Sequence, residues 1–174
     1  MSTHADDTVP RHVLEDLADT LWRERHLVET LLFRMVVAKL LLAADEHRFV
    51  AAAIDEVEAV VDVLRDAERH RLAALLAVAD RLELPVEDLT LAELARRAPL
   101  PMRTVFEDHR DAFLALTTEI EQTAETNRQL ASGALGRIQR SLDALAGNGP
   151  AQTYNAAGRT EVTVAAPMHL DRAL

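Results

Sequence analysis

The sequence predicts an all-α protein: an elongated antiparallel bundle of three long helices and a short connecting helix, followed by a flexible C-terminal tail. Of the 174 residues, 49% are hydrophobic but only 3% aromatic, so Leu, Val, Ala and Ile must build the core. That composition suits helices packed side by side better than a sandwich or barrel. The 5 glycines and 6 prolines are too few for the many tight turns of an all-β chain. We therefore expect a flexible N-terminus at 1–9, a bundle at 10–146 and a tail at 147–174.

The first long helix is expected from about Pro10 to Ala44, and Pro10 suits a first helical turn. Its apolar residues recur in alternating steps of three and four, which is typical of helices that pack lengthwise. This row is apolar except at Glu24 and comprises Leu14, Leu17, Leu21, Glu24, Val28, Leu31, Met35, Ala38 and Leu42. Further apolar residues such as Trp22 and Phe33 widen it, which indicates that the helix either faces more than one neighbour or buries a second face against a partner.

The second long helix is expected over 47–82, after a break near Asp45, and its apolar row runs from Val50 to Leu82. Residues 45–68 carry many carboxylates against only Arg48 and Arg65. A solvated outer face explains them most simply. An acidic docking surface is the functional alternative.

Pro85 ends that helix, and a short helix is expected over 90–98, because Thr90 and Glu93 form a capping box. A third long helix follows over about 102–146. Residues 89–110 also resemble, weakly, a helix-turn-helix that would bind DNA. Glu107 and Asp108 would face phosphates there, which disfavours that alternative against a plain connector.

Composition and motifs favour a binding protein over an enzyme. Lys and Arg number 19 and Asp and Glu 29, giving 19 − 29 = −10, and such a charge opposes general nucleic-acid binding. The chain has no cysteine, no phosphate-binding glycine loop and no Glu-x-x-His pair of a bundle metal site. We therefore expect no catalytic residue, no metal and no cofactor. The N-terminus does not resemble a signal peptide, and the apolar run 35–44 is interrupted by Lys39 and too short to span a membrane, so no membrane insertion is expected.

The last long helix changes character midway. Thr123 and Asn127 place polar side chains in its apolar row, and a buried Asn can fix helix register. Gly133 and Gly136 then destabilise the helix, each by roughly 1 kcal/mol relative to Ala. The apolar residues beyond them either tolerate exposure or are offered to the helices of another protein.

The tail differs from the rest of the chain. It holds Tyr154, the only tyrosine, in "QTYNAAGRT", whose Asn and Gly favour a turn. Residues 160–164, "TEVTV", alternate like a strand. No second strand is evident in the sequence, so we expect this segment to add to another chain or to stay mobile.

Three stretches together resemble the FlgN family of flagellar export chaperones, in the form found in high-GC Gram-positive bacteria. "AETNRQLASGALGRIQRSLDAL" resembles its last helix, "TYNAAGRT" its Tyr–turn–Gly cassette and "HLDRAL" its terminal segment. The resemblance extends from about Leu14 to the end. It implies a cytoplasmic protein without enzymatic activity that binds hook-associated proteins of the FlgK and FlgL type. It also implies that their terminal helices are covered until delivery to the flagellar type III export gate.

An amphipathic client helix needs an apolar groove, which the far half of the last helix and the wide apolar row of the first helix could supply. The expected client-binding residues are Asn127, Leu130, Leu135, Ile138, Leu142 and Leu145. The resemblance implies the docking residues of the tail. Tyr154, Asn155 and Gly158 would dock on the export gate, although the chain continues well past Gly158 and the segment 160–174 is an alternative contact. We expect a monomer or weak homodimer. A self-associating structural coiled coil remains the alternative within the same fold.

Overall fold

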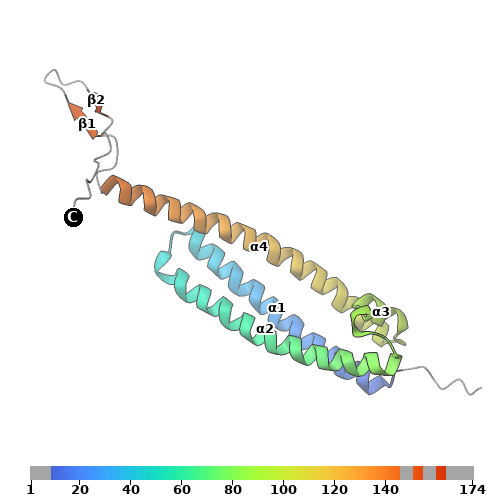
Figure 1. Cartoon of the computed structure of the whole chain (residues 1–174). Coiled ribbons are helices and arrows are strands. Elements are labelled where there is room, and N and C mark those ends of the chain that lie inside the picture. Colours follow the sequence, from blue (N-terminus) through green and yellow to red (C-terminus); the bar gives the residue numbers. More distant parts are fainter. Residues whose placement is uncertain (1–8, 146–150, 155–159, 164–174) are drawn as a thin grey trace, which may run out of the picture. The chain divides into compact units, whose positions relative to one another are not determined.

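The computed structural model describes residues 9–145, 151–154 and 160–163. The chain divides into two compact units, Met1–Leu130 and Ala131–Leu174, and the last helix belongs to both. The helical elements confirm the predicted all-α bundle (Figure 1). They are α1 (Arg11–Ala43), α2 (His47–Leu82), the 3-10 turn η1 (Val86–Asp88), α3 (Leu91–Arg97) and α4 (Met102–Leu145).

In the first unit, α1 and α2 form an antiparallel hairpin and lie side by side (Figure 1). Asp45 adopts φ 61°, a left-handed conformation that turns the chain between the helices, which confirms the predicted break. Two ion pairs join the helices: Arg34 Nη1 lies 2.7 Å from Glu56 Oε2, and Arg71 Nε lies 2.8 Å from Glu24 Oε2.

The connector between α2 and α4 is built from local end signals. Glu83 ends α2 in the left-handed conformation at φ 52°. Thr90 caps α3, because its hydroxyl oxygen accepts a hydrogen bond from the Glu93 amide at 3.2 Å. This confirms the predicted short helix and its cap.

The core lies at one end of the hairpin, where the connector folds against the start of α1 and the end of α2. Leu17, Val78 and Phe106 are 0% exposed there. These residues come from α1, α2 and α4, and α3 adds Leu94. Residues 89–110 therefore close a core, which favours the connector interpretation over a DNA-binding element. The complete buried cluster is Leu14, Leu17, Ala18, Leu21, Val78, Ala79, Leu89, Leu94, Ala95, Ala98, Met102 and Phe106.

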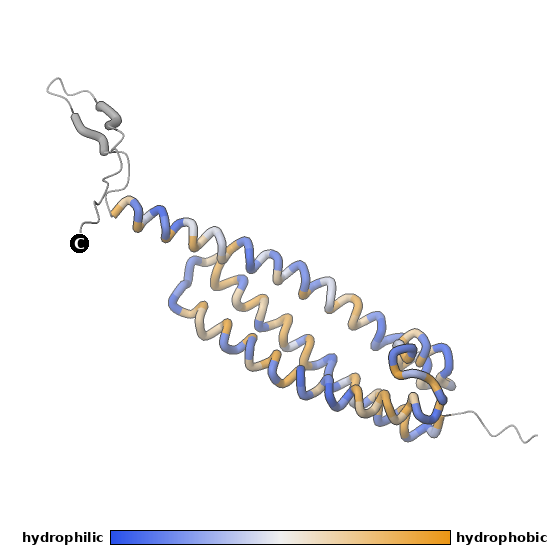
Figure 2. The backbone as a smooth tube through the Cα atoms, viewed as in Figure 1, coloured by the Kyte–Doolittle hydropathy of each residue, from blue (hydrophilic) through white to orange (hydrophobic). Residues whose placement is uncertain are grey.

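Apolar residues continue along α1 and α2 far beyond this core (Figure 2). In that longer part of the hairpin only Ala38 and Ala53 are buried hydrophobic residues, and the larger side chains are half-buried or exposed. The hairpin therefore carries apolar surface that its own helices do not cover.

The second unit contains two paired strands, which contradict one prediction about the tail. Strands β1 (Ala151–Tyr154) and β2 (Thr160–Thr163) pair antiparallel, with Ala151 opposite Thr163 and Tyr154 opposite Thr160. The expectation that residues 160–164 lack a strand partner in this chain is therefore wrong. The partner "AQTY" is only four residues long, too short for its alternation to be recognised. The other residues of the tail predicted to be flexible lie outside the described residues.

Candidate interaction surfaces

The distal half of α4 exposes large apolar side chains. Ile138 is 49%, Leu142 54% and Leu145 85% exposed. Their spacing of four and three residues places them on one face of the helix. Leu135, 68% exposed and three residues before Ile138, lies on the same face. These four residues, all predicted from the sequence to contact a client, are called the α4 face below.

The two other predicted client residues are placed differently. Asn127 is half-buried, and its Nδ2 donates a hydrogen bond of 3.0 Å to the Met35 carbonyl oxygen of α1. Its Oδ1 is buried without a hydrogen-bond partner. Leu130 is half-buried, and Thr123, one turn before Asn127, is 7% exposed. Asn127 thus anchors α4 on α1, and the structure does not place it with the α4 face.

A buried histidine that sequence reasoning missed lies where α4 meets α1. His109 is 1% exposed, and neither ring nitrogen has a hydrogen-bond partner. Its ring contacts Trp22 edge-on at 4.8 Å and stacks on Phe113 at 6.3 Å between centroids. Burial, and next the charge of Arg25, lower its pKa, although Asp108 opposes this. In the sequence, His109 lies in the same apolar row as Met102, Phe106 and Phe113, and this position could have indicated its burial.

The lowered pKa of His109 predicts a stability that depends on pH. Below about pH 6.5, the ordinary His value, the unfolded chain binds a proton that the folded chain resists. The contribution of His109 to the free energy of unfolding is therefore fully present above that pH and falls as the pH falls toward the folded-state pKa. His109→Asn should flatten the decrease in urea-unfolding free energy between pH 7.5 and pH 5.5. An unchanged decrease would contradict the assignment, since the other histidines are common to both proteins.

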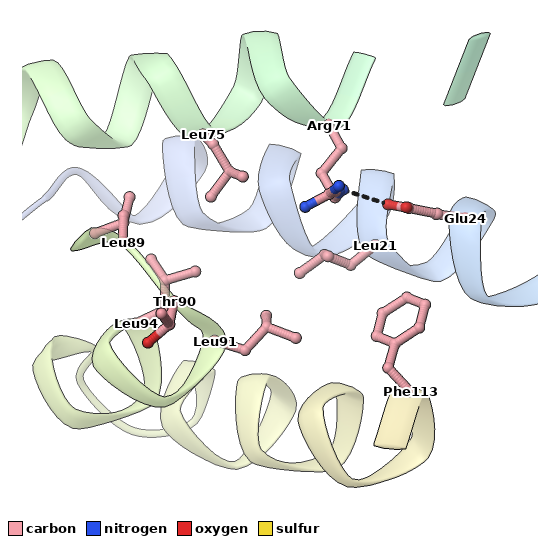
Figure 3. Close-up of a pocket in the computed structure, with 9 residues that line it drawn as sticks. All are labelled: Leu21, Glu24, Arg71, Leu75, Leu89, Thr90, Leu91, Leu94 and Phe113. Atoms are coloured by element: carbon pink, nitrogen blue, oxygen red, sulfur yellow. Dashed lines mark ion pairs between the residues drawn. The ribbon is translucent and has the colours of Figure 1, made fainter. Parts of the chain in front are cut away.

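A cavity of about 300 Å³ opens between α1, α2, the connector and α4 (Figure 3). One wall carries the Arg71–Glu24 pair; Arg71 Nε and Glu24 Oε2 lie 2.8 Å apart but make no hydrogen bond of good geometry. Burial raises the pKa of Glu24, against the opposing charge of Arg71. The other lining is mainly apolar, and the complete set is Leu21, Glu24, Arg71, Leu75, Leu89, Thr90, Leu91, Leu94 and Phe113.

The described residues offer no metal site and no membrane span. No group of three or more His, Asp or Glu side chains in these parts of the chain is arranged to hold a metal ion. No helix among them is long and apolar enough to cross a membrane.

The predicted export-gate residues are only partly described. Tyr154 is the last residue of β1 and pairs with Thr160. Asn155 and Gly158 lie between the two strands, outside the described residues, so their turn stays a prediction. The pairing nevertheless brings the two ends of this connecting segment together.

One comparison with known proteins identifies a family. The family model described as "FlgN protein" matches residues 13–161, which is most of the chain. No curated protein and no solved structure gave a significant match.

Proposed function

Because the chain belongs to the FlgN family of flagellar export chaperones, we propose that it binds the terminal helices of hook-associated proteins in the cytoplasm. These clients are of the FlgK and FlgL type. Binding prevents their premature assembly and holds them for delivery to the export gate. The observation that carries the proposal is the exposed α4 face, formed by Leu135, Ile138, Leu142 and Leu145.

The α4 face suits an amphipathic client helix. Such a helix lays its apolar side on an apolar partner, with anchors spaced by three and four residues. Burying a Leu or Ile side chain contributes about 1.5–3 kcal/mol, so several anchors together offset the cost of association. Leu130, which is half-buried in the first unit, is proposed as a further client contact. Asn127, also in the first unit, donates its side-chain hydrogen bond to the Met35 carbonyl oxygen and so holds that part of α4 on α1.

The tail contributes the later step of this proposal. Tyr154, Asn155 and Gly158 dock on the export gate, with Tyr154 carried by a paired strand. A paired strand limits the backbone conformations of Tyr154, which lowers the ordering cost of docking. The segment 160–174 is the alternative gate contact. Variants before residue 159 and variants after it show which of the two segments docks on the gate.

Removing the tail tests whether client binding and export-gate docking use different parts of the chain. A chain ending after Gly147 keeps the whole α4 face and should co-purify with the hook-associated proteins of its own genome as the full chain does. The same truncation, and Tyr154→Ala in the full chain, should reduce secretion of those clients in a flagellated host. Loss of the client complex on truncation would instead assign client binding to residues 148–174.

A further inference from the structure

We propose that the C-terminal segment of this chain, residues 164–174, covers the α4 face until a client helix displaces it. The face and the segment both belong to the second unit, Ala131–Leu174. The segment is thus an internal competitor of the client, which makes the free chaperone autoinhibited. The covering of the face stands without the proposed function, whereas the competition with a client rests on it.

The apolar surface of α4 is most exposed where the chain leaves the helix. Ile138 is 49% and Leu142 54% exposed, and Leu145, the last residue of α4, reaches 85%. Burying such side chains is favourable in proportion to the apolar area removed from water. The surface that gains most from a cover therefore lies next to the part of the chain that can supply one.

The strand pairing brings the end of the chain back toward α4. Strand β1 follows the helix, β2 runs antiparallel to β1, and Thr163 lies opposite Ala151. The stretch from Leu145 to Ala151 spans at most about 22 Å, and paired residues of antiparallel strands lie about 5 Å apart. Thr163 therefore lies within about 27 Å of Leu145, whereas residues 164–174 can extend to about 36 Å. The segment can reach Leu145 and Leu142 whatever the orientation of the two strands.

The composition of the segment suits an apolar face. Its sequence is "VAAPMHLDRAL", and the other side chains in it are apolar or small apart from three. These three are His169, Asp171 and Arg172. Leu170 and Leu174 are four residues apart, as Ile138 and Leu142 are, so a helical turn presents both to the α4 face. The one Asp and the one Arg balance each other, so the net charge of −10 does not repel the segment.

Covalent linkage makes a small contact sufficient. A segment joined to its site by a short flexible stretch has an effective concentration of about 1 mM, so even a weak contact keeps the face covered for most of the time. A client helix with more apolar anchors still displaces it, because the client binds only the uncovered state. Displacement frees residues 164–174, which form most of the alternative gate contact.

Thiol labelling of the full chain tests the cover. The chain has no cysteine, so Leu142→Cys introduces a single thiol on the α4 face. Adding Leu170→Ser/Leu174→Ser should speed its reaction with a maleimide about fivefold, because the segment no longer protects it. Adding His169→Ser/Arg172→Ser, which changes polar positions of the same segment, should leave the rate unchanged. Circular dichroism checks that each variant stays folded.

A thiol elsewhere is the second control. Leu114 is 64% exposed in the first unit, and the thiol of Leu114→Cys should react at one rate with and without the leucine changes in the tail. An unchanged rate at position 142 in the leucine variant, or an equal increase in the polar variant, would overturn the proposal. Protection that grows with protein concentration would assign the face to a second copy and would overturn it as well.

Calorimetry with a purified hook-associated protein separates this inference from the proposed function. Leu170→Ser/Leu174→Ser should tighten client binding about fivefold, since the competitor is weakened. If the thiol at position 142 reacts faster but the affinity for the client stays the same, the cover holds and the α4 face is not the client site. If the thiol rate stays the same while the α4 face still binds the client, the cover is wrong and the proposed function holds.

Discussion

Replacing Phe106 with alanine is expected to destabilise the first unit by about 3–5 kcal/mol. Phe106 is 0% exposed and belongs to the cluster that joins α1, α2, the connector and α4. Truncation removes its burial energy and leaves a cavity that rigid helices on several sides fill only in part. The free energy of unfolding of a folded domain is about 5–15 kcal/mol in total, so this loss is a large part of the stability.

Urea unfolding followed by circular dichroism measures this effect. Phe33→Ala is the matched control, because Phe33 is 59% exposed on α1 and its truncation should cost no more than about 0.5 kcal/mol. Similar losses for the two variants would contradict a core concentrated at the connector end. If the Phe106 variant does not fold, Phe106→Leu should give a smaller but measurable loss.

The second large effect concerns client binding. Ile138→Ser/Leu142→Ser should weaken binding to a hook-associated protein by about a hundredfold or more, because two buried anchors contribute roughly 3 kcal/mol together. Isothermal titration calorimetry with the purified client measures the change. The free energy of unfolding should change little, since Ile138 and Leu142 are about half exposed before any client binds.

The control for this variant replaces two exposed leucines of the first unit. Leu100 is 74% and Leu114 64% exposed, so Leu100→Ser/Leu114→Ser removes comparable apolar surface outside the α4 face. It should bind the client as the wild type does. Equal weakening by both variants would mean that the client recognises apolar surface in general.

The helices were predictable because their signals are local. The apolar rows in steps of three and four set the spans, and Thr90 with Glu93 set the start of α3. The second helix was predicted at 47–82, as found, and the first and the short helix differ from their predicted bounds by one residue at each end. End signals of this kind depend on a few neighbouring residues, which the sequence displays directly.

The position of the core was not predictable in the same way. The apolar row of α1 continues along the whole helix, yet its large buried residues, such as Leu14 and Leu17, lie only near its start. The connector folds back there and adds Leu94 and Phe106. Such burial depends on long-range contacts that periodicity does not encode.

The candidate site was predictable in part. The apolar row of α4 indicated Ile138 and Leu142, which are exposed on the same helical face. The polar interruption at Asn127 suggested a register-setting contact, and its hydrogen bond to Met35 gives that contact a partner. Glu24 is a charged residue in an apolar row of the sequence. Its place in the cavity wall is evident only in the structure, where Arg71 lies beside it.

We propose that this chain binds a hook-associated client through its helices. The most direct measurement is a calorimetric titration of the purified full chain with the terminal helical segments of its genome's hook-associated proteins. We expect saturable binding with one client segment per chain and a dissociation constant of about 1 µM or tighter. Absence of binding to every such segment, with the chain folded and helical, would contradict it.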